Sequence, residues 1–412
     1  MNVMERFGAL FGGGGARRRG RRERGERGVP ERPLNVVFEL DSLEACERTR
    51  ALLGLLGHLD RERFHFTLAC VEREGALAPR ARALGAGVRS LDGDPARYRA
   101  LLGEGPTDLV AAIGSGFGLP LTAEAGVAHL QLFDSGARVL AEESKAMRRE
   151  VREVERVVAV SPAVGDRVRR RLKVRGERLQ FVPPGVDVAG LAGRCAGPRE
   201  EARRELGFGD EALVFLCLGD FEPATGHAHA IRAFGRLSER HPEAALVCAG
   251  DPVDPAHLER CRALADGARV RISPLEPEAD PARLYAAADF FVQPVGVDGL
   301  RQATLEAFAC GRPLVVAGGA DVGEMVGEPP AAVLFRERVD WSKRRRKALA
   351  NLRDPADEAL TPLFNALGRA CREAPQLKDA AIANGRDAVE AGYGIEAVAR
   401  CWEGVLLAAW SA

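Results

Sequence analysis

Residues 213–237 carry the pattern of a phosphate-binding turn. The stretch LVFLCLGDFEPATGHAHAIRAFGRL starts as an apolar run typical of a buried strand and ends with apolar residues at helical spacing. A strand-to-helix turn often binds phosphate, because the free amides and positive dipole end of the helix face the anion. This turn holds Asp220 and Glu222 and no lysine or arginine. Acidic side chains repel phosphate, so this turn is predicted to differ in charge from an ordinary phosphate-binding turn.

Smaller motifs favour structural roles. The glycines of GSGFG at 114–118 are spaced one position too closely for a dinucleotide fingerprint, so a tight turn is favoured over a nucleotide contact. The sequence DGD at 92–94 is typical of a turn rather than a metal site. His227 and His229 are two apart and do not share a helix face, so we predict no metal there. The basic run at 342–349 indicates a solvated helix face, or a surface for anionic lipid or phosphate.

Strand and helix patterns alternate twice along the chain after Pro33. Strands are predicted at 34–40, 64–71, 87–91, 108–114, 128–133, 156–161 and 178–187, and helices at 43–58, 77–85, 138–155 and 162–172. After a segment rich in Gly, Arg and Glu, strands are predicted at 213–219, 244–250, 270–274, 290–295 and 313–318, and helices at 226–239, 255–266, 280–288 and 302–310. This alternation predicts an α/β protein with two doubly wound parallel sheets. Ligands of such sheets bind beyond the carboxyl ends of the strands, so we expect the site in a groove between the two domains.

Composition indicates a folded protein without a bulk charge signal. Of the 412 residues 46% are hydrophobic, and 59 basic residues balance 59 acidic ones, so any nucleic-acid or membrane contact must come from a local patch. The nine cysteines show no CxxC spacing, which favours reduced, mostly buried thiols of a cytosolic protein over a disulfide or zinc framework. No apolar run is long enough to span a membrane. Residues 1–33 hold nine Arg against four Glu, which indicates a flexible tail or a weak tether to anionic lipid.

Several stretches together resemble the family 4 glycosyltransferases of the GT-B fold. They are VVAVSPAVGDRV, FVPPGVDV, FLCLGDFEPATGHAHAIRAFGRL, ALVCAGD and LYAAADFFVQPVGVDGLRQATLEAFACGRPLVVAGG, in this order. The resemblance covers about 34–330 and implies two Rossmann-like domains that face each other across a cleft, with a C-terminal helix crossing back. We expect a disordered basic tail at 1–33, an acceptor-binding domain at 34–190, a linker at 191–211, a nucleotide-sugar-binding domain at 212–388, and a helix packing on the first domain at 389–412.

The resemblance implies a retaining, metal-independent glycosyltransferase of the hexosyltransferase type. Such an enzyme needs no cofactor and takes a nucleotide-diphosphate sugar, here expected to be UDP- or GDP-linked, as its substrate. The expected acceptor is a glycan or glycolipid, in cell-surface polysaccharide or glycolipid assembly. The expected place is the cytoplasm, with possible peripheral contact at the inner membrane face through the basic tail, and no nucleic acid is expected as a partner.

Site residues follow from the family's motifs, position by position. Glu306 matches a glutamate that accepts hydrogen bonds from the nucleotide ribose. Asp298 stands where the family has a glutamate for the sugar hydroxyls, and it is one methylene shorter. Gly299 and Leu300 belong to the loop that approaches the donor. Arg301 replaces a family glycine and is expected either to reach the phosphates or to pair with one of the two carboxylates.

The phosphate-binding cations of the family are absent from their positions. Gly219 and Gly226 match the two glycines of the phosphate turn, but the arginine position holds Asp220 and the lysine position holds Thr225. Losing one charge-stabilising donor in an enzyme site typically costs about 100- to 1000-fold in rate. Two hypotheses therefore stand. One is a working transferase that uses Arg301, Asp298 and Glu306; the other is a non-catalytic protein of the same fold that binds a sugar, a nucleotide or a partner.

Overall fold

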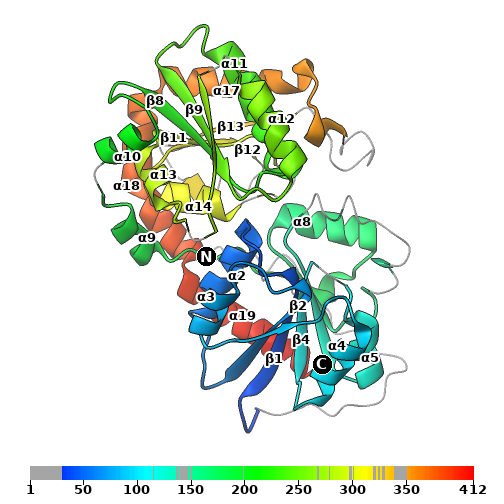
Figure 1. Cartoon of the computed structure of the whole chain (residues 1–412). Coiled ribbons are helices and arrows are strands. Elements are labelled where there is room, and N and C mark those ends of the chain that lie inside the picture. Colours follow the sequence, from blue (N-terminus) through cyan, green and yellow to red (C-terminus); the bar gives the residue numbers. More distant parts are fainter. Residues whose placement is uncertain are drawn as a thin grey trace. The chain divides into compact units, whose positions relative to one another are not determined.

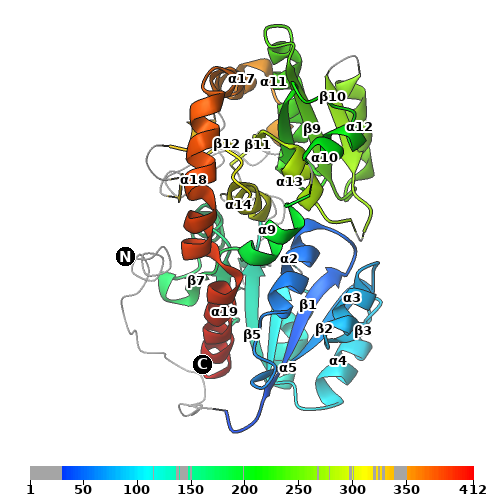
Figure 2. The ribbon, with the colours of Figure 1, turned by 90° about the vertical axis from the view of Figure 1, so that its left-hand side faces the viewer.

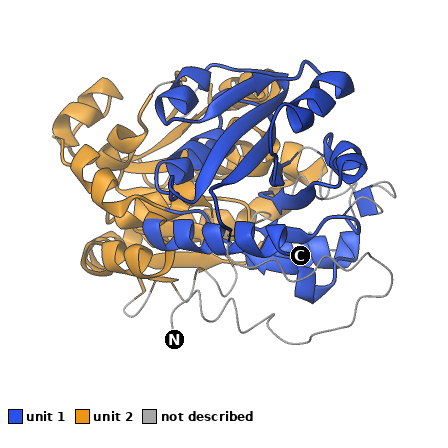
Figure 3. Ribbon diagram, turned by 90° about the horizontal axis from the view of Figure 1, so that it is seen from below, with its two compact units in different colours: residues 1–185, 396–412 blue, residues 186–395 orange. Residues whose placement is uncertain are grey.

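A computed structural model describes residues 30–412, except positions 115, 136–138, 140–146, 149–150, 198, 267–268, 278, 297–298, 300, 319–321, 323–324, 327–329 and 338–349. The chain divides into two compact units (Figure 3). Unit 1 comprises residues 1–185 and 396–412, and unit 2 comprises residues 186–395.

Unit 1 is built on a seven-stranded sheet with the order β3-β2-β1-β4-β5-β6-β7, in which all paired strands are parallel (Figure 1). Strands β4 and β5 are buried along their whole length, as expected when helices cover both faces of a parallel sheet. The elements are β1 (Leu34–Ser42), α2 (Glu47–Leu56), β2 (Phe64–Arg73), α3 (Ala78–Ala83), β3 (Gly87–Ser90), α4 (Pro95–Gly103), β4 (Leu109–Ile113), α5 (Leu119–Ala125), β5 (Ala128–Phe133), β6 (Arg156–Ala159), α8 (Pro162–Arg167), the π-helical turn η1 (Val168–Leu172), the 3-10 turn η2 (Gly176–Arg178) and β7 (Leu179–Phe181).

Unit 2 holds a six-stranded parallel sheet with the order β10-β9-β8-β11-β12-β13. Its core joins aromatic and aliphatic side chains of the strands to those of helices α11, α12 and α17. The elements are α9 (Val188–Arg194), α10 (Arg199–Glu205), β8 (Leu213–Leu218), the 3-10 turn η3 (Pro223–Thr225), α11 (His227–Leu237), β9 (Ala244–Gly250), α12 (Pro255–Ala265), β10 (Val270–Pro274), α13 (Ala282–Ala287), β11 (Phe290–Gln293), α14 (Gln302–Ala309), β12 (Leu314–Ala317), β13 (Ala332–Phe335), α17 (Asp357–Arg372) and α18 (Ala374–Tyr393).

The last helix, α19 (Ile395–Trp410), follows α18 directly (Figure 2). Its residues from 396 onward group with unit 1. There Glu403 accepts a hydrogen bond from the amide of Asp60 at 3.0 Å and pairs with Arg63 at 3.1 Å. The apolar side of the helix, including Trp402 and Leu406, is buried. Within the described ranges, no helix is both long and apolar enough to cross a membrane.

The structure confirms the predicted pair of parallel sheets and corrects several elements. Residues 191–211 were predicted as a linker, yet α9 ends within this segment, α10 lies inside it, and both helices belong to unit 2. Strand β13 and helices α4 and α5 were not predicted, because a four-residue apolar run and short helices give weak periodic signals. The helix predicted at 138–155 falls mainly outside the described residues, and residues 151–155 form a turn rather than its last part.

The cysteines are all free thiols. Five of the nine are partly exposed, namely Cys46, Cys195, Cys310, Cys371 and Cys401, so the prediction that most are buried is wrong. The spacing of the nine cysteines in the sequence did not indicate which of them are exposed. In the structure, several of the five partly exposed cysteines lie at helix ends or on helix sides next to solvent.

Candidate functional site

The topology of unit 2 places its candidate site at the carboxyl ends of β8 and β11. The chain winds from β8 outward to β9 and β10, and then returns to build β11, β12 and β13 on the other side. The loops that follow β8 and β11 therefore diverge at a topological switch point, which is where open α/β sheets bind ligands. The first loop spans 219–226 and the second spans 294–301.

The loop after β8 is held close to the neighbouring strand. Gly219 donates its amide to the carbonyl of Ala249 at 3.1 Å. A Cβ atom on Gly250 would lie 1.7 Å from the carbonyl oxygen of Gly219, so only glycine permits this approach. Gly226 has φ +85° and immediately precedes α11, a conformation that other residues rarely adopt. Gly219, with φ +153°, also has a backbone conformation that other residues rarely adopt, so both glycines expected to shape the turn lie at positions that need them.

Thr225 does not stand in for a lysine. Its hydroxyl donates to the main-chain carbonyl of Asp220 at 2.6 Å, and its side chain is buried. The same carbonyl accepts the amide of Glu222 at 2.7 Å. The side chain of Thr225 thus closes the turn from within, and its hydroxyl hydrogen is already used by the backbone.

Helix α11 begins at this turn without a side-chain cap. Its first residue, His227, is fully buried; the ring stacks on Phe221 with 4.4 Å between centroids, and Nε2 lies 3.3 Å from the carbonyl of Cys217. The first amides of a helix have no partner within the helix, and together with the helix dipole they favour an anion. The amino end of α11 therefore provides electrostatic stabilisation for a negatively charged ligand.

Arg301 brings a cation to the phosphate turn from the other loop. A Cβ atom placed on Gly219 would lie 2.9 Å from Nη2 and 3.3 Å from Cζ of Arg301, and 3.0 Å from Cγ2 of Thr225. The guanidinium thus fills the space beside Gly219 that a side chain would take. The guanidinium of Arg301 therefore lies at this turn.

A buried glutamine fixes the loop that carries Arg301. Gln293, the last residue of β11, donates its side-chain amide to the carbonyl of Gly299 at 2.7 Å and accepts the hydroxyl of Thr304 at 2.5 Å. Glu337 accepts the amide of Gly296 in the same loop at 2.6 Å. One signal of this arrangement is present in the sequence, namely the polar Gln293 inside the apolar run FFVQPV. Arg301 is thus held between a clamped loop and the first turn of α14.

Glu306 is oriented by two hydrogen bonds. The hydroxyl of Tyr285 donates to Oε2 at 2.7 Å, and the side-chain amide of Gln302 donates to Oε1 at 2.8 Å. Each carboxylate oxygen can accept a further hydrogen bond, so the group can still bind a ligand hydroxyl. Sequence reasoning missed both donors. The four-residue spacing of Gln302 and Glu306 within the predicted helix could have indicated one of them, whereas Tyr285 comes from another helix and had no local signal.

Two predicted site residues, Asp298 and Leu300, lie outside the described residues. The other predicted residues of the site all belong to the two loops or to α14. Gly219, Asp220, Thr225 and Gly226 form the first loop; Gly299 (φ +71°) and Arg301 belong to the second, and Glu306 follows one turn into α14.

The corresponding place in unit 1 holds a buried carboxylate. Glu39, near the end of β1, accepts the hydroxyl of Tyr98 at 2.6 Å and the amide of Gly118 at 3.0 Å. The nearby Glu44 pairs with Arg73 at 2.9 Å and accepts the amide of Ala76. The side chain of Glu44 is therefore engaged by its own unit.

No cluster of three or more metal-ligating side chains occurs within the described ranges. Burial is the main cause that lowers the pKa of the buried His229 from 6.5 to about 4, with smaller contributions from its neighbours His257 and Arg232. In unit 1, burial likewise lowers the pKa of His129 to about 4.

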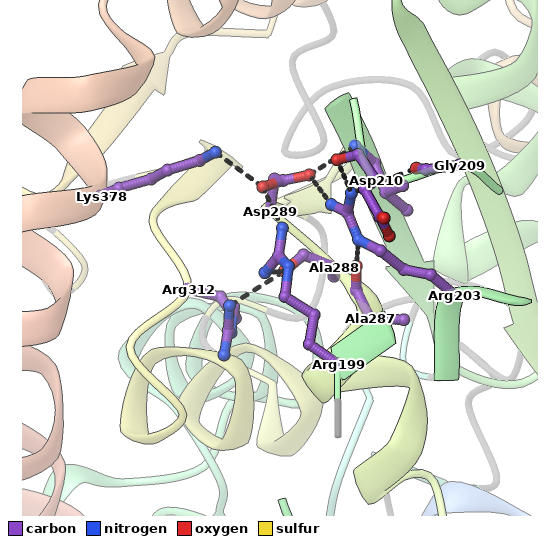
Figure 4. A network of polar contacts seen from close by, with 10 residues as sticks. Arg199, Arg203, Gly209, Asp210, Ala287, Ala288, Asp289, Arg312 and Lys378 are labelled. Atoms are coloured by element: carbon purple, nitrogen blue, oxygen red, sulfur yellow. Dashed lines mark hydrogen bonds and ion pairs between the residues drawn. The ribbon is translucent and has the colours of Figure 1, made fainter. Parts of the chain in front are cut away.

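The sheet of unit 2 carries a buried ionic network at the end opposite the candidate site (Figure 4). Asp289, which precedes β11, is 2% exposed and binds Arg199, Arg203, Lys378 and the amide of Val214. Burial raises the pKa of Asp289, but the hydrogen bonds from Lys378 and Val214 and the charge of Arg199 outweigh it, so the net shift is downward. This network lies at the amino ends of β8 and β11, and it stabilises the strands whose other ends form the candidate site.

Comparison with solved structures identifies the architecture. The Anabaena protein HepE in complex with UDP and glucose has a TM-score of 0.69 at 17% identity, over 90% of this chain and 99% of that one. The fold is GT-B. This likeness concerns the fold, since the sequence identity is low.

A family model matches the unit that holds the candidate site, and curated proteins are similar to about half of the chain. Residues 212–351 match the family model described as glycosyl transferases, group 1. The chain is 32% identical over 237 residues to the D-inositol 3-phosphate glycosyltransferase of Actinosynnema mirum, covering 53% of this chain and 54% of that protein. It is 29% identical over 203 residues to the GDP-mannose-dependent monoacylated alpha-(1-6)-phosphatidylinositol monomannoside mannosyltransferase of Corynebacterium glutamicum, covering 48% and 52%. The chain spans about half the length of the curated relatives it matches.

Proposed function

We propose that this protein is a retaining glycosyltransferase that takes a nucleotide-diphosphate sugar as donor and a glycan or glycolipid as acceptor. The observation that carries the proposal is the guanidinium of Arg301 beside Gly219, because it returns a positive charge to a phosphate turn whose usual cations are missing. The match of residues 212–351 to glycosyl transferases supports the same conclusion.

The diphosphate of the donor would bind between Arg301 and the amino end of α11. The uncapped first turn supplies amide hydrogens, and the arginine supplies a full charge with planar donors suited to phosphate oxygens. Asp220 opposes this binding because its carboxylate belongs to the same turn. We therefore expect donor binding to be weaker than in an enzyme with both cations.

Glu306 would hold the nucleoside through hydrogen bonds from its ribose. Tyr285 and Gln302 fix the carboxylate before the ligand arrives, which reduces the entropy lost on binding. For the sugar itself we propose Asp298, with Gly299 and Leu300 allowing the loop to approach.

In the reaction, the acceptor oxygen bonds to the anomeric carbon as the bond from that carbon to the β-phosphate oxygen breaks. The hydroxyl proton passes to the departing phosphate, and retention requires that both events occur on the same face of the sugar. Negative charge grows on the leaving diphosphate in the transition state. Arg301 and the α11 amides act by stabilising that charge, so they would contribute to rate as well as to binding.

We place the acceptor in unit 1 and the reaction on the cytoplasmic side of a membrane. The names of the two curated relatives, which include an inositol phosphate and a phosphatidylinositol mannoside, support a phosphorylated or lipid-linked acceptor. The net of five positive charges in residues 1–33 supports a peripheral contact with anionic lipid. We propose that the transfer proceeds without a metal or cofactor.

Calorimetry with UDP, GDP and their hexose conjugates tests the proposal. We expect binding of one nucleotide family at micromolar to millimolar concentration, with slow hydrolysis of the matching sugar nucleotide. Binding without hydrolysis or transfer would support instead a non-catalytic protein of the same fold, which the replacement of both cations favours. No binding of either nucleotide at millimolar concentration would refute the donor site.

A further inference from the structure

Cys195 and Cys310 form a pair of thiols that the proposed transfer reaction does not use. Cys195 ends α9 and Cys310 ends α14, and the two helices pack against each other in unit 2. The sulfur atoms lie 2.9 Å apart, although the residues are 115 positions apart in the chain.

The distance between the two sulfurs suits bond formation. A disulfide needs about 2.05 Å between the sulfur atoms, so these two would have to approach by about 0.9 Å. Each thiol stands at a helix end, where small adjustments of side chain and backbone are easiest. Both residues are partly exposed, so a small reagent can reach them.

Another neighbouring pair lacks this exposure. Cys217 and Cys248 lie opposite each other on β8 and β9, but they are 1% and 0% exposed. Burial raises the pKa of Cys261 to about 12, and burial with the charge of Glu243 raises that of Cys371 to about 12. Proximity, exposure and a favourable charge are therefore combined at the pair Cys195 and Cys310.

The charges around Cys195 favour its thiolate. A hydrogen bond from Cys310 and the positive charges of Arg312 and Arg194 lower its pKa, in spite of burial and the carboxylate of Asp280. When it is protonated, the thiol can donate to the carbonyl of Ala282 at 3.5 Å. Because the thiolate is the nucleophile in disulfide exchange, Cys195 is expected to react first.

We propose that Cys195 and Cys310 are a reversible thiol–disulfide modification site that takes a small disulfide such as glutathione disulfide. The Cys195 thiolate attacks one glutathione sulfur, the glutathione disulfide bond breaks, and the first glutathione leaves with a proton. Cys310 then loses its proton and attacks the Cys195 sulfur, which forms the protein disulfide and releases the second glutathione. The two protein thiols lose two electrons in total, and glutathione disulfide gains them.

The disulfide would connect the end of α14 to α9. Cys310 follows Glu306 by four residues and donates its amide to the Glu306 carbonyl, so the bond would lie one helical turn from that carboxylate on the same helix face. It would also close a loop of 115 residues, which stabilises a fold mainly by restricting its unfolded state.

The test is a thiol map of the full-length protein after treatment with excess glutathione disulfide or with glutathione. Remaining thiols are alkylated and the chain is digested with trypsin, which separates the peptide 195–199 from the peptide that begins at Gln302, after Arg301. We expect these two peptides to be joined, with a loss of two hydrogens, and the cysteines at 70, 217 and 248 to remain alkylatable only after unfolding. The oxidised protein should unfold several degrees higher than the reduced one.

Single variants distinguish this pair from general oxidation. Cys195→Ser should leave Cys310 as a thiol with no shift in thermal midpoint on oxidation, whereas Cys310→Ser should trap glutathione on Cys195. Cys401→Ser, which removes another partly exposed thiol, should still form the linked peptides. Free thiols at both positions under excess oxidant, or a lasting glutathione adduct on wild-type Cys195, would overturn the proposal.

Discussion

Replacing Arg301 with alanine tests the electrostatic basis of the proposed donor site. The guanidinium lies beside Gly219, and the turn from 219 to 226 contains no lysine or arginine of its own. Removal of this side chain therefore leaves the amides of α11 and the two acidic residues Asp220 and Glu222 facing the diphosphate. The variant should lose affinity for nucleoside diphosphates.

The expected loss follows from the kind of contact. A hydrogen bond to a charged group is worth about 1.5–3 kcal/mol, and Arg301 is partly exposed, so the lower half of that range applies. A loss of about 2 kcal/mol in binding free energy corresponds to a roughly 30-fold larger dissociation constant. Asp220→Ala removes a like charge and should strengthen binding, and Asp220→Arg should strengthen it further.

Calorimetry with UDP, UMP and GDP measures the effect. The loss in Arg301→Ala should be larger for the diphosphate than for the monophosphate, because the contact is to the phosphates. Arg262→Ala is the matched control, since Arg262 forms an exposed ion pair with Glu259 on α12. Equal affinities in wild type and Arg301→Ala, or a greater loss in Asp220→Ala, would show that Arg301 is not the substitute cation.

Three further predictions concern the ribose contact and the stability of the two units. Glu306→Gln should weaken UDP binding roughly tenfold and leave a deoxyribose analogue almost unaffected, because the variant loses a charged acceptor; calorimetry with both ligands checks this. Asp289→Asn should cost about 3–5 kcal/mol in the free energy of unfolding, because it leaves the buried guanidinium of Arg203 without its counter-charge. The exposed Asp379→Asn should have little effect in the same urea titration. Stability should fall as the pH drops from 6.5 toward 4: the folded-state pKa values of His129 and His229 are lowered to about 4, so the unfolded chain binds more protons in that range. At pH 5 each histidine should reduce the free energy of unfolding by about 2 kcal/mol relative to pH 7, and an unchanged urea midpoint would contradict their burial as neutral rings.

Local pattern predicted most of the sheet framework but not all of its parts. The strands of unit 2 from β8 to β12 are apolar runs bounded by Gly, Pro or Asp, and each was expected within two residues of its observed ends. Strand β13 escaped because Ala-Val-Leu-Phe is short and is recognised only through its pairing with β12. Helix α9 escaped because two of its seven residues are glycines, and α10 escaped because its sequence REEARRE offers one alanine and no larger apolar residue to set a helical period.

The sequence by itself determined that the chain winds two parallel sheets and that the turn at 219–226 holds two acidic residues and no lysine or arginine, since both are properties of residue type and local spacing. Only the tertiary structure decided which cation lies beside that turn. Arg301 follows the turn by about 80 positions, and it reaches Gly219 because β8 and β11 are neighbours in the sheet and Gln293 clamps the intervening loop. The same reason applies to Tyr285 at Glu306 and to the pair Cys195 and Cys310: contacts between distant segments depend on strand order and helix packing, which no local pattern encodes.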